Sequence, residues 1–370
     1  MTGRERVLCA LRHEEPDHVP LSDNLWTDTL ERFRREGMPE DVKPEDFFGY
    51  DISHLSMDLS PRLQPALLAD EGEMLVIRDR YGYVVRKFRG RDRGMEWLEH
   101  PVRHKEDWSA IERCLVVDLD GTSRVDTETY FLRLSEYPDW QEARRRFEAV
   151  RATGRFVTVF AYGPHEIAWR LRGWEQILMD TAEDPDFVAD IYATVATLTI
   201  DTVERAWEEG IRPDAYFMAD DMGHTRAPFF SPTFYRNVLF PQHRRIGAYL
   251  ESRGICYMLH TDGRITDLIP DIIEAGVQIL QPLEAKAGLD VRELKRRYPQ
   301  MTWMGNIDMR RVSADLAQIE QEVRSKIGVA KRGGGYIYHS DHSVPSEVSL
   351  ANYQHLLACV REVGAAGGKP

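Results

Sequence analysis

Polar side chains that can bind a metal ion or carry a proton follow six apolar runs in the part of the chain from residue 155 onward. These polar clusters are residues 162–166, 220–221, 260–263, 281–284, 306–308 and 339–342. Five of the 12 histidines, His165, His224, His260, His339 and His342, lie in or beside them. If the apolar runs are strands of one parallel sheet, their carboxyl ends meet at one edge, and the clusters form one site.

His260 and Asp262 are the pair best suited to hold a divalent ion. They lie two residues apart at the end of an apolar run, so both side chains point to the same side of a strand. A neutral imidazole and a carboxylate are ligands that Zn²⁺ accepts. The last cluster supplies a third ligand through Asp341 or His342, and we predict a zinc site of His260, Asp262 and Asp341. The alternative is a His–Asp pair that performs acid–base work without a metal.

Two adjacent carboxylates, Asp220 and Asp221, follow another apolar run. Because neighbouring strand residues point to opposite sides, we expect one carboxylate in the site and the other in the wall. In the site, a carboxylate serves as a metal ligand or a base. In the wall, it serves as a helix cap or an ion-pair partner. We predict catalytic or positioning roles for Asp220, Asp221, His260, His339 and His342.

Seven further residues are candidates for substrate contacts. They are Asp58, Arg62, Tyr162, His165, Trp169, Met222 and Glu284. Asp58 and Arg62 follow an early strand candidate, and a surface role fits them equally well. Trp169 is more typical of a core position than of a cofactor site.

The elements that carry these residues alternate regularly. From residue 155 onward, apolar strands near 157, 215, 255, 277, 302 and 335 alternate with amphipathic helices, one of them over 231–253. Strand candidates at 18–22 and 51–58 bring the number to eight. Eight βα units that close on themselves form a TIM (β/α)8 barrel, and this is the fold we predict. The alternative, a doubly wound sheet, lacks a GxGxxG after its first strand.

Other parts of the chain depart from this alternation. The β-rich runs MLVIRD and YVVRKF predict a hairpin at 73–88, and the charged, Trp-bearing stretch at about 90–150 predicts a helical insertion. Helices are also predicted over 2–11, with Thr2 as the cap, and over 25–36. We expect one domain spanning 1–370.

Composition narrows the class of protein. The chain has 370 residues with 48 basic and 61 acidic side chains, a net charge of −13. This charge argues against nucleic-acid partners and anionic membranes. No apolar run approaches a membrane span, and the N-terminal segment lacks the apolar core of a signal peptide. Four scattered cysteines are typical of reduced thiols, so we expect a cytoplasmic enzyme.

Several segments together resemble a known family along nearly the whole chain. They are RERVLCALRHEEPDHVP, GPHEIAWRLRGWE, the DD before SPTFYRNVLFPQHRRI, HTDGRITDLIPDIIEAGVQILQPL, MGNID and GGGYIYHSDHSVP. In this order they are similar to the uroporphyrinogen decarboxylase superfamily, which includes zinc-dependent corrinoid methyltransferases. The resemblance implies a TIM barrel, a site at its C-terminal mouth and a homodimer. Trp-bearing segments of the 90–150 insertion would supply an apolar patch for that dimer.

Within this superfamily, the chain is closer to the methyltransferases. The decarboxylases carry an arginine segment after the first strand that holds substrate carboxylates, whereas residues 23–27 here contain no arginine. The methyltransferases hold zinc through a HxC motif and a distant cysteine. The matching positions here are His260, Asp262 and Asp341, so both thiolates are replaced by carboxylates. Such a set is harder and suits an ether or hydroxyl oxygen, or remains without metal.

The resemblance therefore implies a methyltransferase of a corrinoid-dependent system. It would move a methyl group from a small O- or N-methylated compound to the corrinoid of a partner protein, since the chain carries no corrinoid-binding segment of its own. The alternative is a decarboxylase or lyase acting on a small acid or tetrapyrrole, with His260 and Asp221 as acid and base. A third alternative is a small-molecule binding barrel without catalytic activity.

Overall fold

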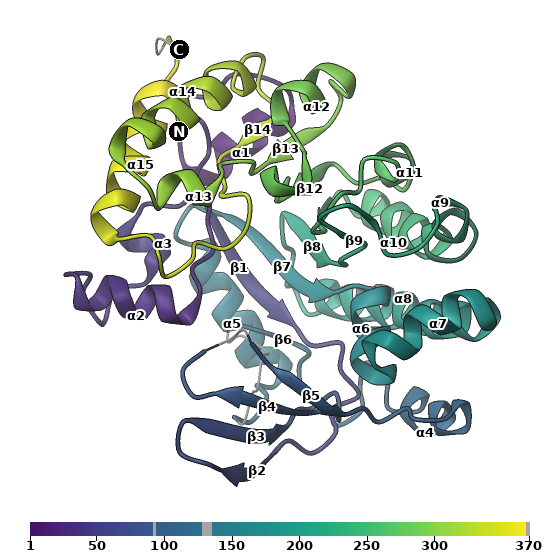
Figure 1. Cartoon of the computed structure of the whole chain (residues 1–370). Helices are drawn as coiled ribbons and strands as arrows, with labels where there is room; N and C mark the ends of the chain where they lie inside the picture. The colour runs from purple at the N-terminus through teal and green to yellow at the C-terminus, as the bar shows by residue number, and fades with distance from the viewer. Residues whose placement is uncertain (92–93, 128–134, 368–370) are drawn as a thin grey trace.

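A mostly parallel eight-stranded sheet forms the centre of the computed structural model, which describes residues 1–91, 94–127 and 135–367 (Figure 1). Its strand order is β14-β13-β12-β11-β8-β7-β1-β6, and only β6 runs antiparallel. The strands are β1 (Ile52–Met57), β6 (Val125–Asp126), β7 (Phe156–Tyr162), β8 (Ala215–Ala219), β11 (Cys256–His260), β12 (Ile279–Gln281), β13 (Thr302–Met304) and β14 (Tyr336–Ile337). The six strands predicted after residue 155 therefore form one parallel sheet, as the alternation indicates.

The N-terminal segment around Leu21 lies between the two ends of this parallel array. The Tyr338 N–H donates to Pro20 O (2.8 Å), and the Ser22 N–H donates to Tyr338 O (3.1 Å). On the other side, the Asp51 N–H donates to Leu21 O (2.7 Å). The segment predicted as the first strand thus bonds to the residue after β14 and to the residue before β1.

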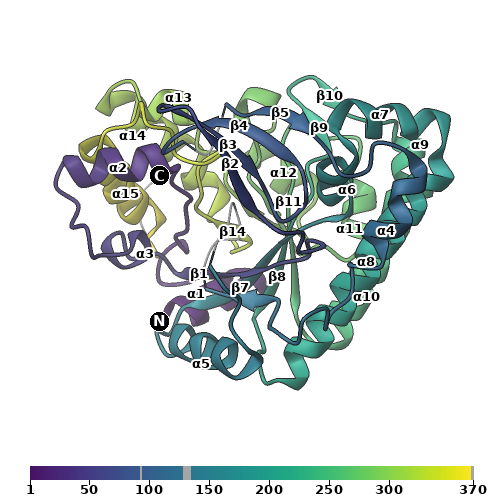
Figure 2. The ribbon, with the colours of Figure 1, turned by 90° about the horizontal axis from the view of Figure 1, so that it is seen from below.

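Helices follow most of the parallel strands and lie outside the sheet (Figure 2). They are α1 (Gly3–Leu11), α2 (Thr27–Arg35), α3 (Pro44–Phe47), α4 (Trp108–Glu112), α5 (Trp140–Arg151), α6 (Pro164–Arg172), α7 (Trp174–Glu183), α8 (Pro185–Glu208), α9 (Pro232–Phe234), α10 (Phe240–Ser252), α11 (Ile269–Glu274), α12 (Val291–Arg297), α13 (Met309–Val312), α14 (Leu316–Ala330) and α15 (Leu350–Gly364). The predicted cap of the first helix is confirmed, because Thr2 and Glu5 form a reciprocal capping box.

The helix predicted over 231–253 is interrupted. A π-helical turn, Tyr235–Leu239, separates α9 from α10. Pro241 lacks an N–H, so a regular α-helical ladder cannot run through this point. Ser231 caps the first turn, as the Ser-Pro pair predicts, by accepting a hydrogen bond from the Phe234 N–H.

A second, antiparallel sheet lies to one side of the main sheet (Figure 1). It consists of β2 (Ala66–Asp70), β3 (Met74–Arg78), β4 (Val84–Phe88) and β5 (Glu96–Glu99). β3 and β4 pair where the hairpin is predicted. β2 and β5 flank them and are mostly exposed, and neither strand is predicted from the sequence.

The predicted insertion at 90–150 contains more than helices. Its described part contains β5, a 3₁₀ turn at Lys105–Asp107, α4, β6 and α5. Outside the insertion, later in the chain, β9 (Gly223–His224) and β10 (Ala227–Pro228) form a two-stranded ribbon. Residues 92–93 and 128–134 of the insertion lie outside the described residues. Within the described chain, no helix is both long and apolar enough to cross a membrane.

Two apolar cores hold this arrangement together. The larger core joins the sheet to the surrounding helices. The smaller one joins side chains from seven strands to Val7 of α1, and its members are Val7, Ile52, Phe156, Ala215, Phe217, Cys256, Met258, Ile279, Met304 and Ile337. Most of these residues precede the ends of their strands, so the smaller core forms a floor beneath the polar strand ends.

Candidate active site at the strand ends

His260, Asp221 and Asp262 meet at the ends of two neighbouring strands. His260 ends β11, and Asp221 follows the adjacent β8 by two residues. The His260 Nε2 atom lies 3.5 Å from Asp221 Oδ1 and 3.7 Å from Asp262 Oδ1. The Asp262 N–H donates to Asp221 Oδ1 (2.9 Å) and fixes the two acidic residues relative to each other. These three side chains form one of the described groups that can hold a metal ion.

A chain of hydrogen bonds determines which nitrogen of His260 is free. The Ser340 carbonyl accepts from His339 Nδ1 (2.7 Å), so that nitrogen must carry the hydrogen. The other His339 nitrogen, Nε2, then accepts from the Gln281 amide (3.1 Å). The Gln281 oxygen in turn accepts from His260 Nδ1. The neutral His260 ring therefore presents an unprotonated Nε2 to Asp221 and Asp262.

The donor set fits a divalent cation. Asp262 Oδ1 is buried and has no hydrogen-bond partner, although it faces His260. Ligands at ~2.0–2.1 Å from a tetrahedral ion lie about 3.4 Å from one another, which is close to the two N···O separations here. Here an imidazole would bind the ion through Nε2 while the hydrogen on Nδ1 is directed to an amide oxygen. Together with two carboxylates, this is a donor set that zinc accepts.

A second candidate group shares Asp262. His342 Nε2 lies 3.1 Å from Asp262 Oδ2, and Glu284 completes this group. The Trp26 ring stacks on His342 with the ring centroids 5.5 Å apart. Glu284 also accepts from the Gly263 N–H (2.9 Å) and pairs with the Lys286 ammonium (2.7 Å). Asp262 thus lies between His260 on one side and His342 on the other.

The structure turns Asp341 away from this cluster. Its carboxylate accepts hydrogen bonds from the Met309 and Ala285 N–H groups (3.1 and 3.2 Å), and it belongs to neither metal-type group. The chain bends at residues 341–343, and His342, not Asp341, faces Asp262. Burial raises the pKa of Asp341 to about 6. The structure therefore does not bring the predicted third ligand Asp341 to His260 and Asp262, and the candidate group at this place contains Asp221 instead.

Asp220 and Asp221 separate as their adjacency implies. Asp220 is fully buried and binds His243 Nε2 of α10 (2.8 Å) and the Glu166 N–H at the start of α6 (2.8 Å). Gly163 permits this contact, since a Cβ at that position would lie 2.5 Å from Asp220 Cγ. Asp220 therefore anchors two helices in the wall and does not face the site, contrary to the catalytic role predicted for it.

Charge in the cluster divides the acids into two kinds. Burial, together with the negative charges of Asp262 and Glu166, raises the pKa of Asp221 well above its usual value. Burial acts the same way on Asp262, but the nearby His260 and His342 outweigh it and lower its pKa. Burial opposes the charge on His342, yet its hydrogen bond to Asp262 raises its pKa. Asp221 is thus suited to hold a proton, and Asp262 to carry a negative charge.

Asp58 and Arg62 belong to a buried ion cluster and pair with each other. Asp58 contacts Arg80 (3.0 Å), Arg62 (3.4 Å) and the Tyr137 hydroxyl (2.6 Å). The three cations Arg80, Arg124 and Arg62 outweigh the burial of Asp58 and hold its pKa far below the usual range. This cluster follows β1 and joins it to the small sheet, so a substrate role for these two residues has no support from their contacts.

Four other predicted substrate residues lie beside the cluster or behind it. Tyr162 is half-buried, with the Arg170 guanidinium 3.5 Å from its ring centroid. Trp169 donates to Glu166 (2.9 Å). His165 is fully buried and forms a hydrogen bond with the Tyr192 hydroxyl. Met222, which follows Asp221 in the sequence, is also fully buried. His165 and Met222 are therefore core residues, and Trp169 packs against Trp97 and Trp174.

Sequence reasoning missed two residues that the structure places near the cluster. Gln281 accepts a hydrogen bond from His260. The sequence feature that could have revealed it is an amide at the end of the apolar strand next to the one that carries His260 and Asp262. His54 lies in the middle of β1 and contacts Thr158 (2.6 Å) and the Phe217 ring. The sequence feature that could have revealed His54 is a single imidazole within the strand segment ISHLSM. A side chain on such a strand points either into the core or to the surface of the sheet.

His54 predicts a specific loss of stability in acid. Burial and the nearby His339 lower the pKa of His54 from 6.5 to about 4. The folded protein therefore favours neutral His54, so its contribution is complete above pH 6.5 and is lost as the pH falls toward 4. We expect a loss of about 1–2 kcal/mol for this half-buried ring. Urea unfolding across this range should give a flatter profile for His54→Gln, whereas equal profiles for both proteins would contradict this role.

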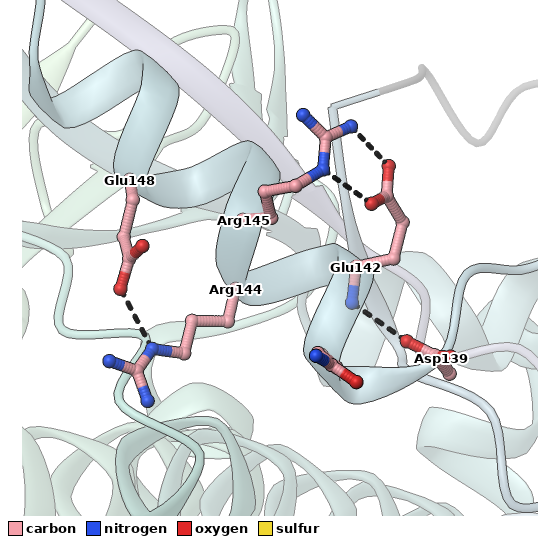
Figure 3. Close-up of a pocket in the computed structure, with 6 residues that line it drawn as sticks. Asp139, Glu142, Arg144, Arg145 and Glu148 are labelled. Carbon is pink, nitrogen blue, oxygen red and sulfur yellow. Dashed lines mark hydrogen bonds and ion pairs between the residues drawn. The ribbon is translucent and has the colours of Figure 1, made fainter.

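A separate pocket on α5 does not resemble a site. It has a volume of about 460 Å³ and is lined by Asp139, Gln141, Glu142, Arg144, Arg145 and Glu148 (Figure 3). Arg145 pairs with Glu142, and Arg144 pairs with Glu148, on an exposed helical surface (Figure 3). Both arginines are thus paired, the remaining acid Asp139 caps the helix, and these charges are mostly exposed to solvent, as on a typical helix surface.

Comparison with solved structures supports the fold. A methyltransferase from Methanosarcina mazei is 18% identical, covers 97% of this chain and 98% of its own, and superposes with a TM-score of 0.65. An endo-β1,6-glucanase is 10% identical, with coverages of 95% and 78% and a TM-score of only 0.39. No curated protein matches the sequence.

These structural similarities show the fold alone, whereas a family model identifies the protein family. The model of the uroporphyrinogen decarboxylase family matches residues 133–363. The matched part includes β7 to β14 and carries His260, Asp221, Asp262 and His342. The chain is therefore a member of the uroporphyrinogen decarboxylase (URO-D) family.

Proposed function

We propose that this protein is a methyltransferase that moves a methyl group from a small O- or N-methylated compound to the corrinoid of a partner protein. Membership of the URO-D family and the fold shared with a methyltransferase support this assignment. We also propose that the sheet closes into a (β/α)8 barrel through residues 20–22, which bond to both ends of the parallel array. The cluster around His260 then lies at the C-terminal mouth.

One observation carries the proposal. The hydrogen-bond chain from Ser340 through His339 and Gln281 places the hydrogen of a neutral His260 ring on Nδ1, so that Nε2 can bind an ion beside the unpartnered Oδ1 of Asp262. His260, Asp262 and Asp221 would hold a divalent ion, with His342 and Glu284 on the far side of Asp262. Such an ion supplies positive charge that polarises the oxygen or nitrogen bearing the methyl group.

The side chains account for the remaining demands of the reaction. The bond from the methyl carbon to its oxygen or nitrogen breaks, and a bond to the cobalt of the reduced corrinoid forms with the electron pair of Co(I). The pair of the broken bond stays on the leaving atom. Burial opposes the charge on His342, but its hydrogen bond to Asp262 raises its pKa, so His342 holds a proton that a leaving oxygen takes up. Trp26 stacks on His342 and fixes this imidazole beside Asp262.

Metal content tests the ligand set. The protein purified with zinc and washed free of loose ions is compared with Asp262→Asn, whose amide keeps the shape but lacks the negative charge. We expect the variant to carry one equivalent of zinc less than the wild-type protein, measured by elemental mass spectrometry. Equal zinc content in the two proteins would contradict a metal at Asp262.

Gln281 predicts a positioning effect. Gln281→Leu removes the acceptor that keeps the hydrogen on His260 Nδ1, so we expect activity to fall about 10–100-fold with the fold retained. Gln281→Glu restores an acceptor for His260 but no donor for His339, so it should recover part of the loss. Steady-state rates of both variants check this. If Leu and Glu were equally impaired, the orientation of His260 would not be the reason.

Decarboxylation of uroporphyrinogen is expected to be absent. A substrate with eight carboxylates needs several free cations, yet Arg62 and Arg80 are paired with Asp58, and the cluster itself is rich in acids. An assay for coproporphyrinogen should therefore show no product above background. Accumulation of coproporphyrinogen would overturn the choice of reaction.

The assembly follows from the same assignment. We propose that the corrinoid is brought by a separate protein that docks at the strand ends, and that the enzyme is a homodimer. All four cysteines, Cys9, Cys114, Cys256 and Cys359, are free thiols, in keeping with the proposed cytoplasmic location.

A further inference from the structure

Three metal-binding side chains meet on the outer helices α14 and α15. His355 and Cys359 are four residues apart on α15 and therefore lie on the same helical face. Glu320 projects toward them from α14, which packs beside α15 (Figure 1). The His355 Nε2 atom lies 3.3 Å from Glu320 Oε1 and 3.5 Å from Cys359 Sγ.

These separations match those of ligands around a tetrahedral ion. Zinc binds nitrogen and oxygen at ~2.0–2.1 Å and sulfur at ~2.3 Å, which places N and O about 3.4 Å apart and N and S about 3.6 Å apart. The same His355 nitrogen faces both other donors, as a ligand atom in a shared site must. Glu320 and His355 are partly exposed, so an ion reaches the group from solvent.

The group is more than a surface ion pair. A helical ion pair needs only Glu320 and His355, yet the thiol of Cys359 also lies at hydrogen-bonding distance from the same nitrogen. One thiolate, one imidazole and one carboxylate form a donor set that zinc accepts with a water as the fourth ligand. We propose that Glu320, His355 and Cys359 form a second divalent-cation site, suited to zinc, that clamps α14 to α15.

The position of the clamp gives it a structural effect. The end of α15 holds the N-terminal segment, since the Val19 N–H donates to Gly364 O (3.0 Å). Lys331, just after α14, donates to Val363 O (2.7 Å) near the end of α15. An ion that joins α14 to α15 therefore stabilises the part of the molecule where the N-terminal segment meets the end of α15.

Cobalt binding tests this site separately from the strand-end cluster. Co²⁺ bound to a thiolate gives a sulfur-to-cobalt charge-transfer band in the near ultraviolet, whereas the two groups at the strand ends consist of His, Asp and Glu. Full-length protein, stripped of metal and kept reduced, is titrated with Co²⁺. We expect the band in the wild-type protein and in Asp262→Asn, and its loss in Cys359→Ser and in His355→Ala.

Controls separate a built site from loose thiol binding. Cys114→Ser removes the half-buried thiol of Cys114 and should leave the band unchanged. Zn²⁺ should displace the cobalt and raise the melting temperature of the wild-type protein more than that of His355→Ala. Absence of the band in the wild-type protein overturns the proposal. A band that survives both His355→Ala and Glu320→Gln also overturns it, because the ion would then be bound by the thiol alone.

Discussion

His260→Ala is expected to abolish methyl transfer and to release the metal at the strand ends. The substitution removes the only imidazole that faces Asp221 and the unpartnered oxygen of Asp262 within this three-residue group. Loss of an outer partner of a metal ligand already costs about 10–100-fold, so loss of the ligand itself should exceed about a hundredfold. Metal content and the rate of corrinoid methylation should fall together.

Cys256→Ala is the matched control on the same strand. Cys256 begins β11 in the buried floor, four residues before His260, and burial raises the pKa of its thiol to about 12. It is therefore a neutral core side chain, and its removal should spare both metal binding and activity. If Cys256→Ala were as damaging as His260→Ala, the effect would belong to the strand and not to the imidazole.

Asp58→Ala should cause the largest loss of stability. Asp58 is only 3% exposed and offers its carboxylate to Arg62, Arg80 and Tyr137. Removing this carboxylate takes a counter-charge away from the buried guanidinium groups of Arg80 and Arg62, which costs about 3–5 kcal/mol. Urea unfolding, followed by circular dichroism, should show the midpoint displaced to lower urea with little change in slope.

Asp120→Ala provides the comparison for this effect. Asp120 also pairs with Arg62 (2.6 Å), but its side chain is 41% exposed. An exposed pair contributes about 0–1 kcal/mol, so this variant should unfold close to the wild-type protein. Equal losses for Asp58→Ala and Asp120→Ala would show that burial of the cluster is not what makes it stabilising.

The parallel sheet was predictable because its strands are buried on both faces. Residues 215–219 are continuously apolar, residues 156–162 are apolar except for Thr158, and the helices between them have a clear period. β2 and β5 were not found in this way, because the apolar run of β2 is only four residues long (ALLA) and is largely exposed, and β5 (EWLE) does not alternate regularly between apolar and polar residues. The break before α10 depends on Pro241, which the helical period alone does not register.

The site was predictable in position more than in detail. The HxD spacing places His260 and Asp262 on one side of a strand, and the structure keeps them within 3.7 Å. Whether Asp341 or His342 joins them depends on which way the chain turns after β14, and no local pattern shows this. Gln281 was missed because an amide at a strand end has no signature until its partner His260 is placed beside it.

Methyl transfer to a reduced corrinoid tests the central claim most directly. The metal-loaded protein is mixed with Co(I) corrinoid, free or on its carrier protein, and with O- and N-methylated compounds in turn, while the absorbance of Co(I) is followed. The account predicts that at least one compound converts Co(I) to methylcobalt, and that His260→Ala fails with the same compound. Co(I) that persists with every compound in the presence of folded, metal-loaded protein, or conversion at the same rate by His260→Ala, would contradict the account.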